Sequence, residues 1–104
     1  MLEKLMAINV GLNRRFPTGN EPFQIITRLV EECGELAGEV NHFEGSGVKR
    51  DKHGAPDRAK LAKEVQQVLC CALQVAQYCR IEEELKASLE HSYQRLKAEG
   101  FLDE

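Results

Sequence analysis

The stretch RLVEECGELAGE, residues 28–39, places apolar side chains at steps of three and four between clustered glutamates. This is the period of an amphipathic α-helix and not the alternation of a half-buried strand. Pro22 suits a first helical position and Gly45 a stop, so we predict a helix over residues 22–43. Its buried side is predicted to hold the apolar residues Ile26, Leu29, Val30, Cys33, Leu36, Ala37 and Val40.

The helical period recurs on both sides of this stretch, and no segment shows the alternation of a strand. A first helix is predicted to end before Phe16, a third to begin after Pro56, and a fourth to span about residues 81–99. A chain of 104 residues fits one domain. The predicted fold class is therefore all-α, with four helices in a single domain over residues 1–104.

The third predicted helix is apolar on nearly all sides between Val65 and Cys79, which is typical of a buried helix. The other helices of such a short chain can hardly surround it, because small domains bury a modest core. We therefore expect part of this helix to face a second copy of the chain, so that homodimerisation completes the core.

Composition excludes several classes of protein. The net charge of −3 argues against nucleic-acid binding, for which a basic stripe is expected. The longest apolar stretch, residues 68–76, is far shorter than the roughly 20 residues that span a membrane. No signal peptide is predicted, so the expected compartment is the cytoplasm. The four cysteines lack a Cys-x-x-Cys pair and are expected to be buried thiols.

The glutamates of residues 28–39 lie too close together to be favourable on their own. Glu32 and Glu35 share one helix face, and two like-charged pairs, Glu31–Glu35 and Glu35–Glu39, each cost a few tenths of a kcal/mol. Gly34 and Gly38, within the same turns, each cost about 1 kcal/mol relative to alanine. A divalent cation would turn the repulsion into attraction, and the glycines would allow a helix or a substrate to approach closely.

The third helix offers a second pair of oxygen-bearing side chains, because Glu64 and Gln67 are also three residues apart. Two antiparallel helices that each present such a pair can hold magnesium, which prefers oxygen ligands and keeps several waters. On spacing alone, the alternative is a solvated acidic face opposite an apolar stripe.

These two motifs resemble those of a known family. RLVEECGEL, residues 28–36, is similar to the Glu-Glu-x-x-Glu signature of the MazG-like, all-α nucleoside triphosphate pyrophosphohydrolases, and KEVQQVL, residues 63–69, occupies the place of their Glu-x-x-Asp. The similarity covers roughly residues 22–99. It implies a four-helix MazG-like bundle that forms a homodimer or, as a dimer of dimers, a homotetramer.

The resemblance also implies a function and a site. The expected activity is the hydrolysis of a nucleoside triphosphate to the monophosphate and pyrophosphate, as in the house-cleaning of unwanted nucleotides. The cofactor would be Mg²⁺, with Mn²⁺ as an alternative. Glu31 or Glu35 would act as the general base that orients the attacking water. The implied metal ligands are Glu32, Glu35, Glu64 and Gln67.

The chain departs from the family pattern at several positions. Gln67 replaces an aspartate, so the site loses one negative charge. Ser88, Ser92 and Arg95 stand on the last helix, where the family has a lysine and an asparagine that reach the substrate phosphates. Lys49 and Lys52, in the loop between the motif helices, would compensate if that loop folds over a triphosphate, and a solvated loop is the alternative.

These departures leave two other functions open. One is a catalytically weak helical dimer that binds a nucleotide or a metal without cleaving it, as Gln67, Ser88 and Ser92 suggest. The other is a purely structural helical dimer that serves as the partner of another protein.

Overall fold

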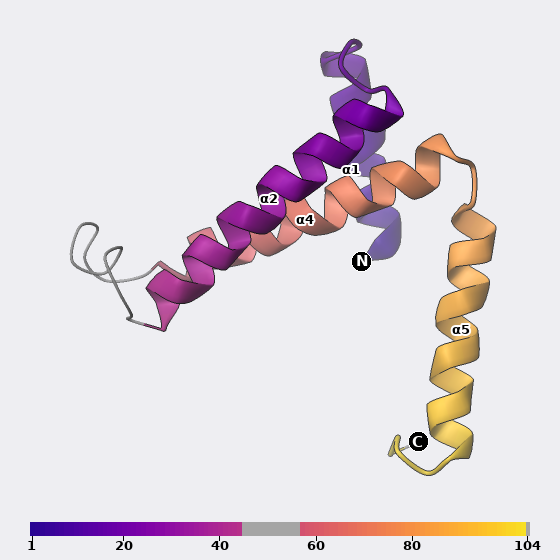
Figure 1. The fold of residues 1–104 in the computed structure, drawn as a ribbon. Helices are drawn as coiled ribbons and strands as arrows, with labels where there is room; N and C mark the ends of the chain where they lie inside the picture. Colours follow the sequence, from indigo (N-terminus) through magenta and orange to yellow (C-terminus); the bar gives the residue numbers. More distant parts are fainter. Residues whose placement is uncertain (45–56, 104) are drawn as a thin grey trace.

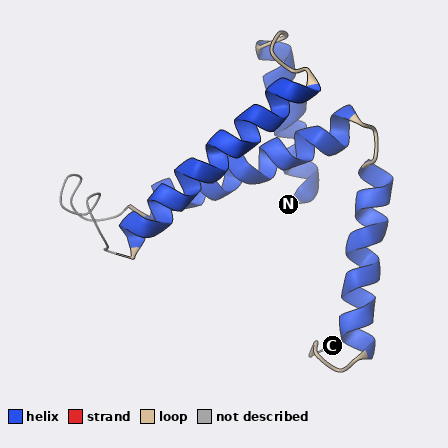
Figure 2. Cartoon of the chain, viewed as in Figure 1, coloured by secondary structure: helices blue, strands red, loops and turns tan. Residues whose placement is uncertain are grey.

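The computed structural model describes residues 1–44 and 57–103, and within these residues the chain is helical with short turns (Figures 1 and 2). The prediction of an all-α fold is therefore confirmed, and the predicted bounds of the second helix match those observed. The helices are α1, Leu2–Arg15; α2, Pro22–Phe43; α4, Arg58–Tyr78; and α5, Glu82–Ala98.

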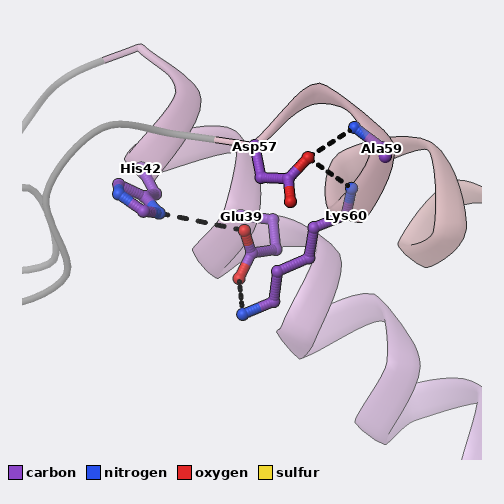
Figure 3. Close-up of polar contacts among 5 residues, drawn as sticks. All are labelled: Glu39, His42, Asp57, Ala59 and Lys60. Atoms are coloured by element: carbon purple, nitrogen blue, oxygen red, sulfur yellow. Dashed lines mark hydrogen bonds and ion pairs between the residues drawn. The ribbon is translucent and has the colours of Figure 1, made fainter.

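The ends of the helices follow local chemistry. Before α2, the Glu21 backbone N–H donates to Gln24 Oε1 at 3.0 Å, which partners one of the donors that a helix start leaves free. At the start of α4, Asp57 Oδ1 accepts from the backbone N–H groups of Ala59 at 2.9 Å and Lys60 at 3.4 Å (Figure 3). Beyond α5, Gly100 adopts a φ of 83°, a conformation that favours glycine and ends the helix.

Helix α4 is the central element of the fold. It runs antiparallel to α2 along much of its length, and α1 also packs against it (Figure 1). Helix α5 packs on the core through Leu85, and its Lys86 Nζ lies 3.5 Å from Glu3 Oε1 of α1. The rest of α5 projects away from the other three helices (Figure 1). No residue of α5 is fully buried. The arrangement is thus a three-helix core with a fourth helix as an arm.

The apolar core lies where α1, α4 and the start of α5 meet. Leu5, Cys70 and Leu73 are its buried members, and Leu85 of α5 packs against them. The most deeply buried side chain nearby is polar: Asn9 of α1 is 1% exposed. This core is small, and large apolar side chains on every helix remain exposed.

Within a single chain, most of the residues predicted to form the buried side of α2 are exposed, and only Leu29 and Leu36 are half-buried. Ile25, which was not predicted, is 3% exposed, whereas Ile26 is 47% and Val30 66% exposed. Cys33 and Cys79, predicted to be buried thiols, are exposed as well. The physical reason is that α2 carries a broad apolar band, and α4 covers one edge of that band. Periodicity identifies the band but not the edge that a neighbouring helix covers.

Among the described residues, no helix combines the length and the apolar character needed to cross a lipid bilayer.

Candidate functional site

The structure brings together three of the predicted metal ligands. Glu32 and Glu35 of α2 and Glu64 of α4 each offer one carboxylate oxygen, and these oxygens all lie within 4.8 Å of one another. We call this group the acidic cluster. The antiparallel packing of α2 and α4 produces it, because each helix supplies its side chains from the turn that faces the other helix. At such distances the carboxylates repel one another strongly unless a cation or hydrogen-bond donors intervene.

Gln67 supplies a donor to the acidic cluster. One terminal atom of its amide lies 3.0 Å from Glu32 Oε2 and 3.3 Å from Glu64 Oε2. An ionised carboxylate can only accept hydrogen bonds, so this atom is assigned as the nitrogen. In this arrangement the Gln67 amide donates a hydrogen bond to each of the two carboxylates and so offsets part of their repulsion. To coordinate a cation it would have to turn its amide oxygen toward the cluster.

The electrostatics of the acidic cluster are unfavourable at Glu32. Partial burial raises the pKa of the Glu32 carboxyl above its ordinary value of 4.5. The charges of Glu35 and Glu64 raise this pKa further, as does a hydrogen-bonding contact with Glu64. A bound cation would reverse the effect by favouring the ionised carboxylate.

Two cavities lie beside the acidic cluster. The first, which we call the amide cavity, has a volume of about 490 Å³, lies between α1, α2 and α4, and includes Glu32 and Gln67 in its lining. The second is an acidic hollow on the surface between α2 and α4. It is lined by Glu31, Gly34, Glu35, Gly38, Glu39, Lys60 and Glu64. The acidic cluster therefore borders both spaces.

At the edge of the acidic hollow, Glu39 is buried and lies beside Lys60 and His42 (Figure 3). Its Oε1 lies 3.3 Å from the Lys60 ammonium, and its Oε2 lies 3.9 Å from His42 Nδ1. The sequence suggested that Glu39 adds to the repulsion among the acids. Instead, Lys60 of α4 offsets its charge, so Glu39 helps to join α2 to α4 and is not part of the acidic cluster.

In the described part of the chain, no other helix approaches Gly34 closely. A Cβ atom added there would meet nothing within 4 Å. The expected neighbouring helix is therefore absent from this position among the described residues, and the space beside Gly34 belongs to the acidic hollow.

The structure places three of the five predicted phosphate-binding residues on α5, away from the acidic cluster. Ser88, Ser92 and Arg95 are exposed on α5 and line neither cavity, and Arg95 Nε donates to Glu99 Oε1 at 3.1 Å. Lys49 and Lys52 lie outside the described residues. The role of all five residues in substrate binding remains a prediction.

The sequence did not predict the amide cavity, whose polar lining includes Asn9, Asn13, Arg28 and Gln74. One signal was present: Asn9 interrupts the apolar face of the first helix between Met6 and Leu12. An asparagine at such a position requires hydrogen-bond partners from other helices, and sequence alone does not identify them.

Comparisons with models of known protein families, with curated proteins and with solved structures gave no match to this chain. The function of the site is therefore inferred from its geometry and from the residues of its motifs.

A change of Glu32→Gln tests the electrostatics of the acidic cluster. Because its pKa is raised, folded Glu32 holds a proton more tightly than unfolded Glu32. Its contribution therefore favours folding at low pH and is lost as the pH rises from 4.5 through the raised pKa. Without divalent cations at neutral pH, the variant should be more stable than the wild type by a few tenths of a kcal/mol for each like-charged neighbour.

The measurement is urea unfolding in EDTA from about pH 4 to about pH 7, a range that spans ordinary carboxyl titration. The stability gain should grow as the pH rises. Glu84→Gln, at an exposed position on α5, is the matched control and should show no such growth. If the gain is the same at every pH, Glu32 is not under electrostatic strain.

Proposed function

We propose that this protein is a magnesium-dependent nucleoside triphosphate pyrophosphohydrolase that acts as a homodimer. The observation that carries this proposal is the convergence of Glu32, Glu35 and Glu64 from two helices, with one oxygen each within 4.8 Å. All three are oxygen ligands of the kind that Mg²⁺ prefers. The resemblance of both motifs to the MazG-like enzymes supplies the reaction.

Each carboxylate has a role in the proposed reaction. Glu32, Glu35 and Glu64 hold the cation, which when bound neutralises charge on the phosphates and makes a water more acidic. Glu31, which lines the acidic hollow next to Glu35 and Glu64, accepts a proton from the attacking water, with Glu35 as the alternative base. The water oxygen bonds to the α-phosphorus, the bond from that phosphorus to the bridging oxygen breaks, and pyrophosphate leaves.

Gln67 favours a second candidate function. Its amide nitrogen already partners Glu32 and Glu64, which lowers the electrostatic need for a cation. A site in which an amide stands in for a fourth carboxylate holds a cation less tightly. The alternative is therefore a catalytically weak helical dimer that binds nucleotide or metal without turnover.

The exposed apolar side chains of α2 and α4 support the homodimer. They form two stripes at alternating steps of three and four, the spacing of helices that pack in a coiled coil. Successive residues are rotated by about 100° around a helix axis. Around that axis, each stripe lies roughly 100° from the face that meets the other helix. In an antiparallel pair, both stripes then emerge on one side. The α2 stripe is Ile26, Val30, Cys33, Ala37 and Val40, and the α4 stripe is Ala62, Val65, Leu69 and Ala72, all of them exposed.

A second copy packed on these stripes would complete the core as a four-helix bundle. By the same helical geometry, Glu35 and Gln67 lie on the opposite side of the α2–α4 pair, so the dimer would leave the acidic cluster accessible. Leu89, Tyr93 and Leu96 of α5 are also exposed and provide apolar surface for a further contact in a homotetramer.

The hydrolase proposal is tested by measuring pyrophosphate release from a panel of canonical and modified nucleoside triphosphates with Mg²⁺ or Mn²⁺. At least one should be cleaved, and Glu64→Gln should lower kcat/KM by about 10²-fold or more, since it removes charge stabilisation in the transition state. Glu84→Gln is the matched control.

Absence of turnover across the whole panel with both metals would reject the enzyme. Metal-dependent nucleotide binding without product would then support the alternative function, a catalytically weak helical dimer that binds nucleotide without turnover.

The dimer is tested by sedimentation velocity. The wild type should sediment as a dimer or larger, and Val30→Lys should weaken association by about 30-fold, because it places a charge in an apolar interface at about 2 kcal/mol. Val30 is 66% exposed, so the fold of one chain should tolerate the change. Ala87→Lys, at an exposed position on α5 outside both proposed interfaces, controls for added charge. A monomeric wild type would refute the interface.

A further inference from the structure

Helix α5 carries three large apolar side chains that remain exposed. Leu89, Tyr93 and Leu96 are 54%, 39% and 44% exposed. They follow one another at steps of four and three, so they lie on one face of the helix, which we call the α5 ridge. Leu85, one turn earlier on the same face, packs on the core. Apolar side chains at this spacing are typical of helices that dock in a groove of another protein.

The amide cavity has the form of such a groove. Helices α1 and α2 both pack on α4, but no Cα atom of α1 lies within 8 Å of a Cα atom of α2. Between them they leave the amide cavity, with a volume of about 490 Å³ and with α4 as its floor. Ile8, Leu12 and Phe16 form an apolar wall, in which Leu12 is 41% and Phe16 56% exposed. The amide cavity is thus a groove with one apolar side.

The α5 ridge matches the amide cavity in length and in chemistry. Along α4, Gln67 and Gln74 of the lining are separated by a rise of about 10 Å. The same rise of about 10 Å separates Leu89 from Leu96 on α5. Tyr93, between these leucines, combines an apolar ring with a hydroxyl that needs a hydrogen-bond partner when buried. A groove with one apolar wall and amides elsewhere in its lining suits both kinds of group.

The α5 ridge of the same chain does not reach the amide cavity, and no residue of α5 lines it. Near its start, α5 meets the first turn of α1, where Lys86 Nζ lies 3.5 Å from Glu3 Oε1. Beyond this contact α5 projects away from the other helices (Figure 1). Leu12 and Phe16 of the cavity wall lie at the opposite end of α1. Only the α5 ridge of another copy can therefore enter the amide cavity.

The charges at the two ends of the amide cavity are complementary to those of α5. At one end, Arg14 and Arg15 occupy the last turn of α1, and the Arg15 guanidinium lies 5.2 Å from the ring centroid of a residue of the cavity wall. The other end borders the acidic cluster. Helix α5 is acidic in its first turn, residues 82–84, and basic in its last turn, at Arg95 and Lys97. An α5 helix whose first turn lies at the basic end therefore brings opposite charges together at both ends, which fixes its direction in the groove.

We propose that the amide cavity receives the α5 ridge of a second copy of this chain. The apolar wall covers the two leucines and the tyrosine ring, and the basic last turn of the second copy's α5 lies beside the acidic cluster. Reciprocal exchange of α5 between two copies satisfies the ridge and the groove of each chain. The contact uses neither the α2 stripe nor the α4 stripe, so it goes beyond the homodimer proposed above and is independent of hydrolysis.

Isotope-filtered NOE spectra test this contact directly. Isotope-labelled chains are mixed with unlabelled chains, and only NOEs that join a labelled chain to an unlabelled one are recorded. Ring protons of Tyr93 should show such NOEs to the methyl groups of Leu12. Because the amide cavity is absent from the surroundings of α5 in one chain, these NOEs can arise only between copies.

A variant of the groove provides a second readout. Leu12→Lys places a charge in the apolar wall and should weaken the contact about 30-fold. The measurement is the rise in the protein concentration at which the Tyr93 ring signals reach their bound position. Val10→Lys is the matched control, because Val10 is 42% and Leu12 41% exposed on the same helix and Val10 does not line the amide cavity.

The inference is overturned if no NOE joins Tyr93 to Leu12 between chains, if Tyr93 instead shows NOEs to the α2 or α4 stripe of the second copy, or if Leu12→Lys associates as tightly as Val10→Lys. These failures are distinct from failure of the proposed function. Magnesium-dependent pyrophosphate release without these NOEs would keep the hydrolase and reject the α5 contact. The NOEs in a protein that releases no pyrophosphate would keep the contact and reject the hydrolase.

Discussion

The packing of α2 against α4 brings carboxylate oxygens of Glu32, Glu35 and Glu64 within 4.8 Å of one another, where like charges repel. The rest of the site depends on this short separation. Without a cation, the Gln67 amide nitrogen donates to two of these carboxylates and offsets part of their repulsion. Burial and the repulsion that remains raise the pKa of Glu32. Apolar contacts and the Glu39–Lys60 ion pair join the two helices. A cation would relieve the same strain more completely.

The position of α1 creates the amide cavity beside the acidic cluster. By packing on α4, α1 closes a cavity on one side of the cluster, while the other side opens to a hollow on the surface. Exposed apolar stripes lie on another side of the α2–α4 pair, so association with a second copy and access to the site are compatible.

The helices and the pairing of Glu32 with Glu35 were predicted because both follow from spacing along a single helix. Glu64 lies on another helix, and the resemblance of the two motifs to the MazG-like family implied that it belongs to the same site. Helix α2 was predicted with its observed bounds, since Pro22 and the glycines after Phe43 are strong local signals. Three features depended on contacts between helices and were not predictable: the burial of Ile25 in place of Ile26, the ion pair of Glu39 with Lys60, and the lack of a hydrogen-bond partner for Asn9 Oδ1 in the described part of the chain. The exposure of α5 likewise depends on which helices it meets.

The most direct test of cation binding is thermal melting in EDTA and in increasing Mg²⁺, without nucleotide. If the three carboxylates bind the ion, Tm rises with its concentration, and a hundredfold excess over Kd adds about 2.7 kcal/mol to the stability of the wild type. Glu35→Gln, at an exposed position, should lose most of this gain, whereas Glu90→Gln on α5 should retain it. An identical Tm in EDTA and at every Mg²⁺ concentration would contradict the existence of the site.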